Sequence, residues 1–313
     1  MYSNFIATYS HKVFLMSFIW KGLVIGITLI KEELNIELLI CLACMIGITR
    51  GPFPPSESGW TSQFLALIHS DLWGPTPVQT QSGFWYMISF TDDFSHYIWT
   101  FFLWQKSDAF ITFKQWKAQV KKESRKSIWA FRTDNGSEYL SNIWTSYMKD
   151  EGIQWETTTT HTPEKNGVFK CLNCSIFNCV WTTLIDASLP LHFWAEVVNY
   201  IMYIKNCSST CILSITPFEM CYKIKPDILC LHCFSCVAYI LDDNPDWCKL
   251  NPKGKHALFI GYSETQKGWR VYHSEKKQIQ VSAHIKFDDN HLTFTTALWL
   301  RGSTSSPTNH WNI

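Results

Sequence analysis

The sequence predicts an α/β protein: a mixed five-stranded sheet flanked by helices, followed by a small β-barrel. Between residues 64 and 187, short runs of aromatic and β-branched residues alternate with helical patterns. After Cys221 the chain changes to short apolar runs separated by Gly, Asn, Asp and Pro. The length of 313 residues and the hydrophobic fraction of 46% allow about two domains with cores of their own.

Charge and cysteine content exclude several classes of protein. Lys and Arg number 27 and Asp and Glu 26, so the net charge is +1. This excludes a protein whose binding depends on overall positive charge, although local basic patches stay open. Twelve cysteines without a regular spacing do not form a disulfide scaffold. The N-terminus has neither a basic start nor a small-residue cleavage site, so we expect an intracellular protein.

The N-terminal 54 residues are apolar and weakly patterned. Val13–Ile30 is long enough to cross a membrane and is interrupted only by Lys21, Gly22 and Gly26. Our main expectation is a segment covered by the fold or never selected for folding, with no membrane partner. A membrane anchor through residues 13–30 is the alternative. Gly51–Gly59 then indicates a linker because it is rich in helix and strand breakers.

The first half of the expected sheet comes from three runs and the turn between the last two. Phe64–Leu72 is a buried strand that carries a carboxylate near its end. Trp85–Thr91 and Tyr97–Trp104 are rich in aromatic and β-branched residues, and Asp92–Ser95 forms the turn between them. A helix follows over Ser107–Lys126, with Asp108 near its start and apolar residues on one face.

The second half of the sheet alternates strands with helices. The expected elements are a strand at 127–132, a helix at 142–151, a strand at 153–157, a loop at 160–167 and a helix from about 168 to 187. The domains expected from these changes of pattern are 1–54 (apolar extension), 55–189 (mixed sheet with helices), 190–229 (helical connector), 230–290 (barrel) and 291–313 (tail).

Asp71 and Asp134 each stand at the end of an apolar strand. Two carboxylates at strand ends of one mixed sheet can lie side by side, and a divalent metal relieves their repulsion. A third acidic residue from a nearby helix would complete a two-metal site for phosphoryl transfer. From spacing alone, most pairs of aspartates 63 positions apart are turn or cap residues.

Six ordered motifs resemble copia-type LTR-retrotransposon integrases over roughly residues 41–289. Ile68–Pro75 (IHSDLWGP) resembles the first catalytic block, and Arg132–Tyr139 (RTDNGSEY) the second. Thr162–Val168 (TPEKNGV) is similar to the lead-in of the third block. The remaining motifs are Thr91–Ser95, Phe193–Glu196 with Thr216–Glu219, and Phe259–Tyr262 with Lys267–Tyr272, the last resembling an SH3-like barrel.

The resemblance implies a ribonuclease H-like core whose Asp, Asp, Glu triad binds Mg²⁺ or Mn²⁺ to process and join DNA ends. It also implies DNA as partner, a homo-oligomer and a nuclear location. Asp71 and Asp134 are the implied catalytic and metal-binding aspartates. The family Glu falls at position 170, which is Lys170, and the 35 intervening residues match the family spacing. Glu164 is the nearest substitute, in the loop expected before the helix.

A protonated lysine cannot bind a metal, so we expect catalysis to be absent. The alternatives are a DNA-binding module without chemistry, or a non-functional relic of a decayed element. DNA-facing candidates are the basic helix residues and two residues of the third lead-in: Lys114, Lys117, Lys121, Lys122, Lys165 and Asn166. A solvated helix face explains the helix charges equally well.

Cysteine pairs do not add up to a zinc site. Cys41 and Cys44 resemble half of the His-His-Cys-Cys module that precedes these cores, but only His11 lies upstream. Three-residue spacings also occur at Cys171 and Cys174 and at Cys230, Cys233 and Cys236, with no residues placed to complete a ligand set. Zinc is therefore not expected.

Overall fold

The computed structural model describes residues 61–134, 136, 139, 141–157, 163–208, 215–227, 230–241, 254–263 and 266–288. For residues 163–172, 174 and 175 it describes the backbone alone. The chain divides into two compact units, with the boundary between Leu231 and His232. No helix in the described ranges is long and apolar enough to cross a membrane, and the apolar segment 13–30 lies outside them.

The first unit contains the mixed five-stranded sheet that the sequence predicts. Its strands are β1 (Leu67–Trp73), β2 (Tyr86–Asp92), β3 (Ile98–Leu103), β4 (Ala130–Thr133) and β5 (Gln154–Thr157), in the order β3-β2-β1-β4-β5. β1, β2 and β3 pair antiparallel, whereas β4 is parallel to both β1 and β5. Consecutive hairpins followed by helical crossovers produce this mixture.

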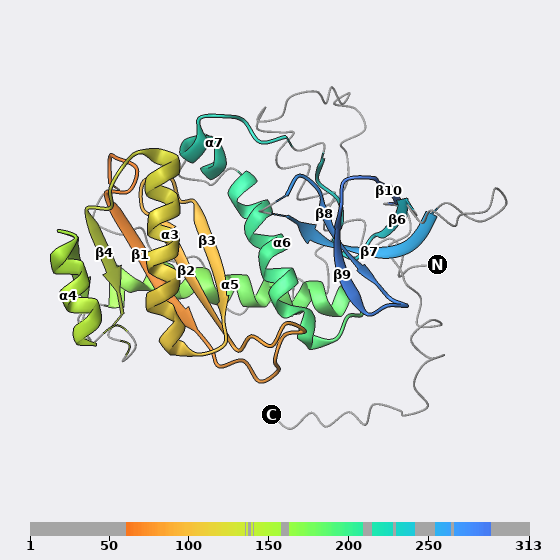
Figure 1. Ribbon diagram of the computed structural model, residues 1–313, viewed down its shortest axis with the longest axis horizontal. Coiled ribbons are helices and arrows are strands. Elements are labelled where there is room, and N and C mark those ends of the chain that lie inside the picture. Colours follow the sequence, from red (N-terminus) through yellow and green to blue (C-terminus); the bar gives the residue numbers. More distant parts are fainter. Residues whose placement is uncertain are drawn as a thin grey trace. The chain divides into compact units, whose positions relative to one another are not determined.

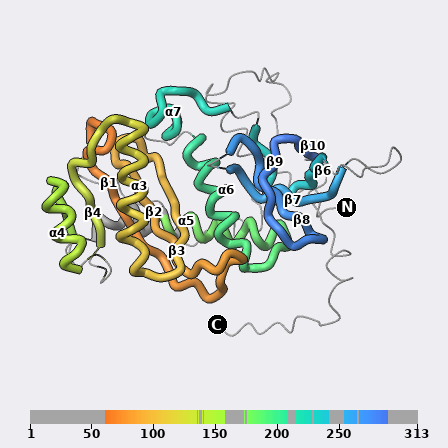
Figure 2. The backbone as a smooth tube through the Cα atoms, viewed as in Figure 1, coloured from red at the N-terminus to blue at the C-terminus, as the bar shows by residue number. Residues whose placement is uncertain are grey.

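Helices cover both faces of this sheet (Figure 1). They are the short 3₁₀ turn η2 (Lys106–Asp108), α3 (Ala109–Ser124), α4 (Asn142–Asp150), α5 (Pro163–Asp186), the 3₁₀ turn η3 (Leu191–Phe193), α6 (Trp194–Cys207) and α7 (Pro217–Tyr222). Figure 2 shows α3 crossing in front of the strands while α5 passes behind them.

The core lies between the sheet and α3. Phe113, Trp116 and Val120 recur at helical spacing and are buried, and Trp116 stacks on Phe90 of β2 at 4.3 Å between ring centroids. Phe113 also packs against Phe131 of β4 at 4.5 Å. These aromatic rings thus bury one another between α3 and the sheet. α3 ends at Arg125, which adopts a left-handed conformation (φ 56°).

Several element boundaries differ from the sequence-based expectation; β1, for example, begins at Leu67 rather than Phe64. α5 begins at Pro163, so the loop expected at 160–167 was wrong for its second half. Proline suits the first turn of a helix because its missing N–H would have no intrahelical partner there. β4 begins at Ala130 rather than Ser127, since its pairing with β1 starts at Leu67 and Ala130.

The second unit is a five-stranded antiparallel sheet. Its strands are β6 (Val237–Leu241), β7 (Gly254–Tyr262), β8 (Trp269–His273), β9 (Gln278–Ser282) and β10 (Ile285–Asp288), in the order β10-β6-β7-β8-β9. Ala238, Ile240, Ala257 and Val271 form its core, with Phe287 packed against them. The sequence predicts a barrel here, whereas the described strands form an open antiparallel sheet with β9 and β10 at its edges.

Candidate functional site

Asp71 and Asp134 stand at the same level of two adjacent parallel strands. Residues Leu67, Ile68 and His69 of β1 pair with Ala130, Phe131 and Arg132 of β4. Asp71 lies two residues after His69, and Asp134 lies two residues after Arg132, directly beyond the end of β4. Because the side-chain period of a strand is two, both aspartates belong to the same face as His69 and Arg132.

Each aspartate is held by a neighbouring polar group. Asn173 of α5 is buried, and its side-chain amide donates a hydrogen bond to Oδ2 of Asp71. Oδ1 of Asp134 accepts the backbone N–H of Gly136 at 3.0 Å. Tyr139, also buried, returns to β1 through a hydrogen bond of 2.9 Å between its hydroxyl and that of Ser70.

The third position of the resemblance lies in helix α5. Lys170 precedes Asn173 by three residues in this helix. Glu164 also lies in α5, in its first turn, and not in a loop as expected. The side chains of Lys170, Glu164, Lys165 and Asn166 are outside the described residues.

The donor set for a divalent metal is incomplete in the described part of the chain. No group of three His, Cys, Asp or Glu side chains there is arranged to hold a metal ion. Asp71 and Asp134 provide two carboxylates, and one oxygen of Asp71 already accepts a hydrogen bond from Asn173. Two Mg²⁺ or Mn²⁺ ions need a further anionic ligand to offset their charge, so the described residues do not fit the two-metal centre.

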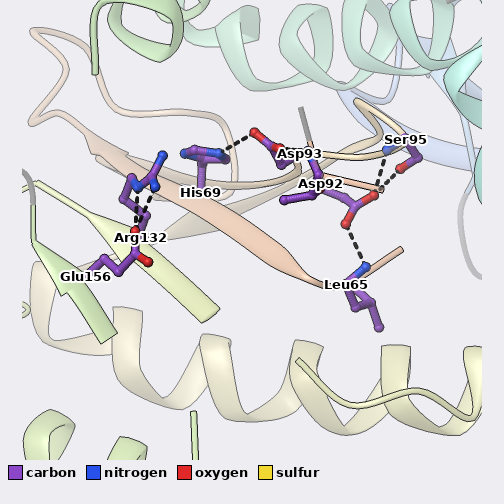
Figure 3. Close-up of polar contacts among 8 residues, drawn as sticks. Leu65, His69, Asp92, Asp93, Ser95, Arg132 and Glu156 are labelled. Carbon is purple, nitrogen blue, oxygen red and sulfur yellow. Dashed lines mark hydrogen bonds and ion pairs between the residues drawn. The ribbon is translucent and has the colours of Figure 1, made fainter. Parts of the chain in front are cut away.

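A buried polar cluster around Asp92 and Asp93 was not predicted from the sequence. Figure 3 shows Asp92, the last residue of β2, beside Leu65, and Asp93, the next residue, beside His69 of β1. The carboxylate of Asp92 is completely buried and accepts the backbone N–H groups of Leu65 (2.8 Å) and Ser95 (2.7 Å) and the Ser95 hydroxyl (2.6 Å). Motif reading assigned these aspartates to a turn, and nothing in the pattern indicates their burial.

Asp93 and His69 form the second part of this cluster. Nε2 of His69 lies 2.9 Å from Oδ1 of Asp93, whose Oδ2 accepts the backbone N–H of Thr61 at 2.7 Å. Burial lowers the pKa of His69 although Asp93 opposes the change, so the imidazole is neutral near pH 7. Burial acts to raise the pKa of Asp93, but the hydrogen bonds from His69 and Thr61 outweigh it and the pKa is lowered.

The pKa of Asp92 is raised, whereas that of Asp93 is lowered, because burial has the larger effect at Asp92. Burial raises the pKa of this carboxyl group even though Ser95 and Leu65 donate hydrogen bonds that favour the ionised form. The three donors nevertheless satisfy the carboxylate within the sheet. The cluster therefore links the β2–β3 hairpin to the chain just before β1, and its hydrogen bonds indicate a structural role.

Arg132 and Glu156 continue the same row of the sheet. They are direct cross-strand partners in β4 and β5, and both Nε and Nη2 of Arg132 contact one oxygen of Glu156 at 2.9 and 2.7 Å (Figure 3). Since Arg132 also pairs with His69, the row His69–Arg132–Glu156 crosses three strands one level below Asp71. Cross-strand pairs of this kind stabilise the sheet modestly.

The basic side chains of α3 lie on the other side of the sheet from the aspartate pair. α3 packs on Phe90 and Phe131, which point to the face opposite to that of Asp71. Lys114, Lys121 and Lys122 are exposed, as expected of a face that contacts DNA or solvent. Lys117 differs: it is buried, and its Nζ contacts Oε2 of Glu151 at 2.8 Å.

Two families of known domains match the chain. The family described as integrase core domain matches residues 63–163, and the retroviral polymerase SH3-like domain matches residues 236–297. The first match contains Asp71 and Asp134 and ends at Pro163, seven residues before Lys170.

The similar curated proteins are polyproteins of plant transposons. The chain is 30% identical over 264 residues to the "Retrovirus-related Pol polyprotein from transposon RE1" of Arabidopsis thaliana, with 84% of this chain covered. It is 30% identical over 253 residues, 80% of the chain, to the corresponding polyprotein from transposon TNT 1-94 of Nicotiana tabacum. The chain spans only 18% and 19% of the length of these relatives.

Solved structures with a similar arrangement are retroviral integrases. The simian T-cell lymphotropic virus intasome in complex with the PP2A regulatory subunit B56 gamma aligns over 79% of this chain and 87% of its own, with 14% identity and a TM-score of 0.44. The HTLV-2 integrase catalytic core domain in complex with magnesium aligns over 50% of this chain and 95% of its own, with 17% identity and a TM-score of 0.38. From the two domain matches and the transposon relatives, we conclude that the chain belongs to the copia-type retrotransposon integrases, as an integrase core domain followed by a retroviral polymerase SH3-like domain.

Proposed function

We propose that this chain is a retrotransposon integrase module that has lost catalytic activity because Lys170 stands at the position of the third carboxylate. The role that the family implies is metal-dependent processing of DNA ends and their joining to target DNA. Asp71 and Asp134 are our candidates for the two remaining carboxylates of that role, and DNA, a homo-oligomeric state and a nuclear location are part of the same proposal.

The observation that carries the proposal is the contact between α5 and Asp71. Asn173 of α5 donates to Asp71, and position 170 lies three residues earlier in the same helix. Residues three apart occupy the same side of an α-helix. The side of α5 that meets Asp71 therefore includes position 170, where a carboxylate would join the pair and an ammonium group cannot act as a ligand.

Glu164 is a poor replacement on geometric grounds. It lies six residues before position 170 in the same helix, which corresponds to about 9 Å along the helix axis at the standard rise per residue. Positions 164 and 170 are also separated by more than one and a half turns, so the two positions belong to different sides of the helix. Rescue by Glu164 would require the start of α5 to unwind and refold.

The test is nicking and strand transfer on plasmid DNA with Mn²⁺. The full chain is compared with Lys170→Glu, with Asp71→Asn, and with the double variant that carries both changes. We expect no activity in the parent, activity in Lys170→Glu, and none in the double variant. Activity in the parent that disappears with Asp71→Asn would contradict the proposal.

A second candidate function is DNA binding without chemistry. The exposed lysines of α3 favour it, because each phosphate contact adds affinity that depends on salt. A non-functional relic is the remaining alternative, and it would show a broad or absent unfolding transition. If all three variants are inactive, salt-dependent binding of duplex DNA by a cooperatively folded chain supports the binding module over the relic.

We also propose that the domain bounds are 55–189 for the catalytic core, 190–229 for the connector and 230–290 for the SH3-like unit, with 1–54 and 291–313 as flanking segments. The family matches at 63–163 and 236–297 fall mainly within the first and third of these. Limited proteolysis followed by mass spectrometry tests the bounds. Stable fragments that begin within α6 would contradict them.

A further inference from the structure

A basic pocket lies where α3 ends and the chain turns into β4. It is bounded on one side by the end of α3 and the segment after it, and on the other by the turn between α4 and β5. Its lining residues are Lys117, Lys121, Lys126, Ser127, Ile128, Glu151 and Ile153. Three lysines against one glutamate give the pocket a surplus of two positive charges.

The one carboxylate of the pocket is already engaged. Oε2 of Glu151 contacts Nζ of the buried Lys117 at 2.8 Å, and this contact lowers the pKa of Glu151 despite the small opposing effect of burial. Nζ of Lys117 also lies 4.7 Å from the ring centroid of Tyr147, so the pair is fixed from two directions. The surplus charge therefore belongs to Lys121 and Lys126, which are exposed and form no ion pair with a residue that the structure describes.

The rest of the lining suits an oxyanion. Ile128 and Ile153 are buried and give the lining an apolar part, while the exposed Ser127 supplies a hydroxyl group. Lysine acts as a point charge toward phosphate, and a serine hydroxyl can donate to the same group. The end of α3 carries partial negative charge, so attraction of an anion depends on the lysine side chains themselves.

We propose that this pocket binds a phosphate group of the nucleic acid backbone, on the face of the sheet opposite to Asp71 and Asp134. α3 covers the face to which Phe90 and Phe131 point, and Asp71 points to the other face. The nucleic acid at the pocket therefore follows a path separate from the aspartate pair. The inference rests on the proposed function only for the identity of the ligand, and it is independent of Lys170.

The first test is the salt dependence of binding to a fluorescent 30-base-pair duplex. The pocket variant is Lys121→Gln/Lys126→Gln, and the matched control is Arg125→Gln/Lys149→Gln, which removes the same charge from exposed positions that do not line the pocket. We expect the pocket variant to lower the slope of log Kd against log salt by about 1 and to weaken binding several-fold at low salt. Equal losses in both variants would overturn the pocket as a site.

The second test is a titration of the ¹⁵N-labelled full chain with inorganic phosphate at constant ionic strength. We expect the backbone amides of Ser127, Ile128 and Ile153 to shift in a saturable manner in the parent and in the control, but not in the pocket variant. The absence of such shifts in the parent would overturn the proposal. Saturable phosphate binding without any binding of duplex DNA would overturn nucleic acid as the source of the phosphate. Neither result depends on catalysis, so failure here is distinguishable from restored activity in Lys170→Glu.

Discussion

Asn173 in α5 donates a side-chain hydrogen bond to Asp71 in β1, a residue 102 positions earlier in the chain. Four residues further along the helix, the ring of Phe177 stacks on Trp73 with 3.5 Å between centroids. Both contacts advance in the same direction, so α5 runs along β1 from Asp71 toward Trp73. This alignment brings α5, the helix that contains position 170, to the strand that carries Asp71.

The Asn173 contact should contribute measurably to stability. We expect Asn173→Ala to lower the free energy of unfolding by about 2 kcal/mol, because a hydrogen bond to a partly buried carboxylate is lost. Urea denaturation followed by circular dichroism measures the change. Asn178→Ala, the same substitution in the same helix, is the control and should cost less than half as much. Equal losses would mean that the Asp71 contact is not responsible, since alanine has the higher helix propensity and cannot itself cause a loss.

Metal binding should depend on the residue at position 170. We expect Mn²⁺ to leave the unfolding temperature of the parent unchanged and to raise that of Lys170→Glu, because only the variant has a third carboxylate. At a metal concentration about 100 times the dissociation constant, the gain would be about 2.7 kcal/mol. Differential scanning fluorimetry provides the measurement. Lys170→Gln removes the positive charge without adding a ligand, and a rise in that variant would refute the carboxylate explanation.

Stability should fall as the pH decreases below about 6.5. Burial lowers the pKa of His69 and of His96, so the unfolded chain takes up protons that the folded chain resists. Their contribution is complete above the unfolded pKa and is lost as the pH falls toward the folded pKa, at most about 1.4 kcal/mol per pH unit for each histidine. The raised pKa of Asp92 acts in the opposite direction at lower pH.

Urea midpoints between pH 7.5 and 5.5 measure this dependence. His69→Gln keeps a side-chain donor for Asp93 but does not titrate, so its stability should vary less with pH than that of the parent. His256→Gln, at an exposed position, is the matched control substitution. An equally steep slope in His69→Gln would show that His69 is not the group responsible.

The carboxylate of Asp92 should be required for the hairpin geometry. Asn offers one acceptor oxygen where Asp92 accepts from Leu65 and from both groups of Ser95, so Asp92→Asn leaves a buried donor unpaired. We expect a loss of about 3 kcal/mol in the free energy of unfolding, measured in urea. Asp108→Asn, at a carboxylate that accepts an exposed backbone N–H at 3.0 Å, should cost below about 1 kcal/mol.

Motif and periodicity recovered the sheet well, and the exceptions have physical causes. The five strands of the first unit were located from their apolar runs because burial selects residue types that a pattern reveals. The start of α5 was missed because Pro163 and Gly167 indicate a loop when the stabilising contacts of a helix are unknown. The SH3-like strands were expected only as a region, since short strands with irregular turns carry a weak periodic signal.

The sequence by itself determined the family, the alternation of strands and helices, the two strand-end aspartates and the lysine at position 170, because each is a matter of residue identity and spacing. Tertiary structure alone decided which groups meet. In the folded chain His69 contacts Asp93, and Asp92 is buried where three groups donate hydrogen bonds to it. Lys117 forms an ion pair with Glu151, and α3 covers the face of the sheet opposite to Asp71. These outcomes depend on strand register and on which face of the sheet each helix covers, and long-range packing sets both.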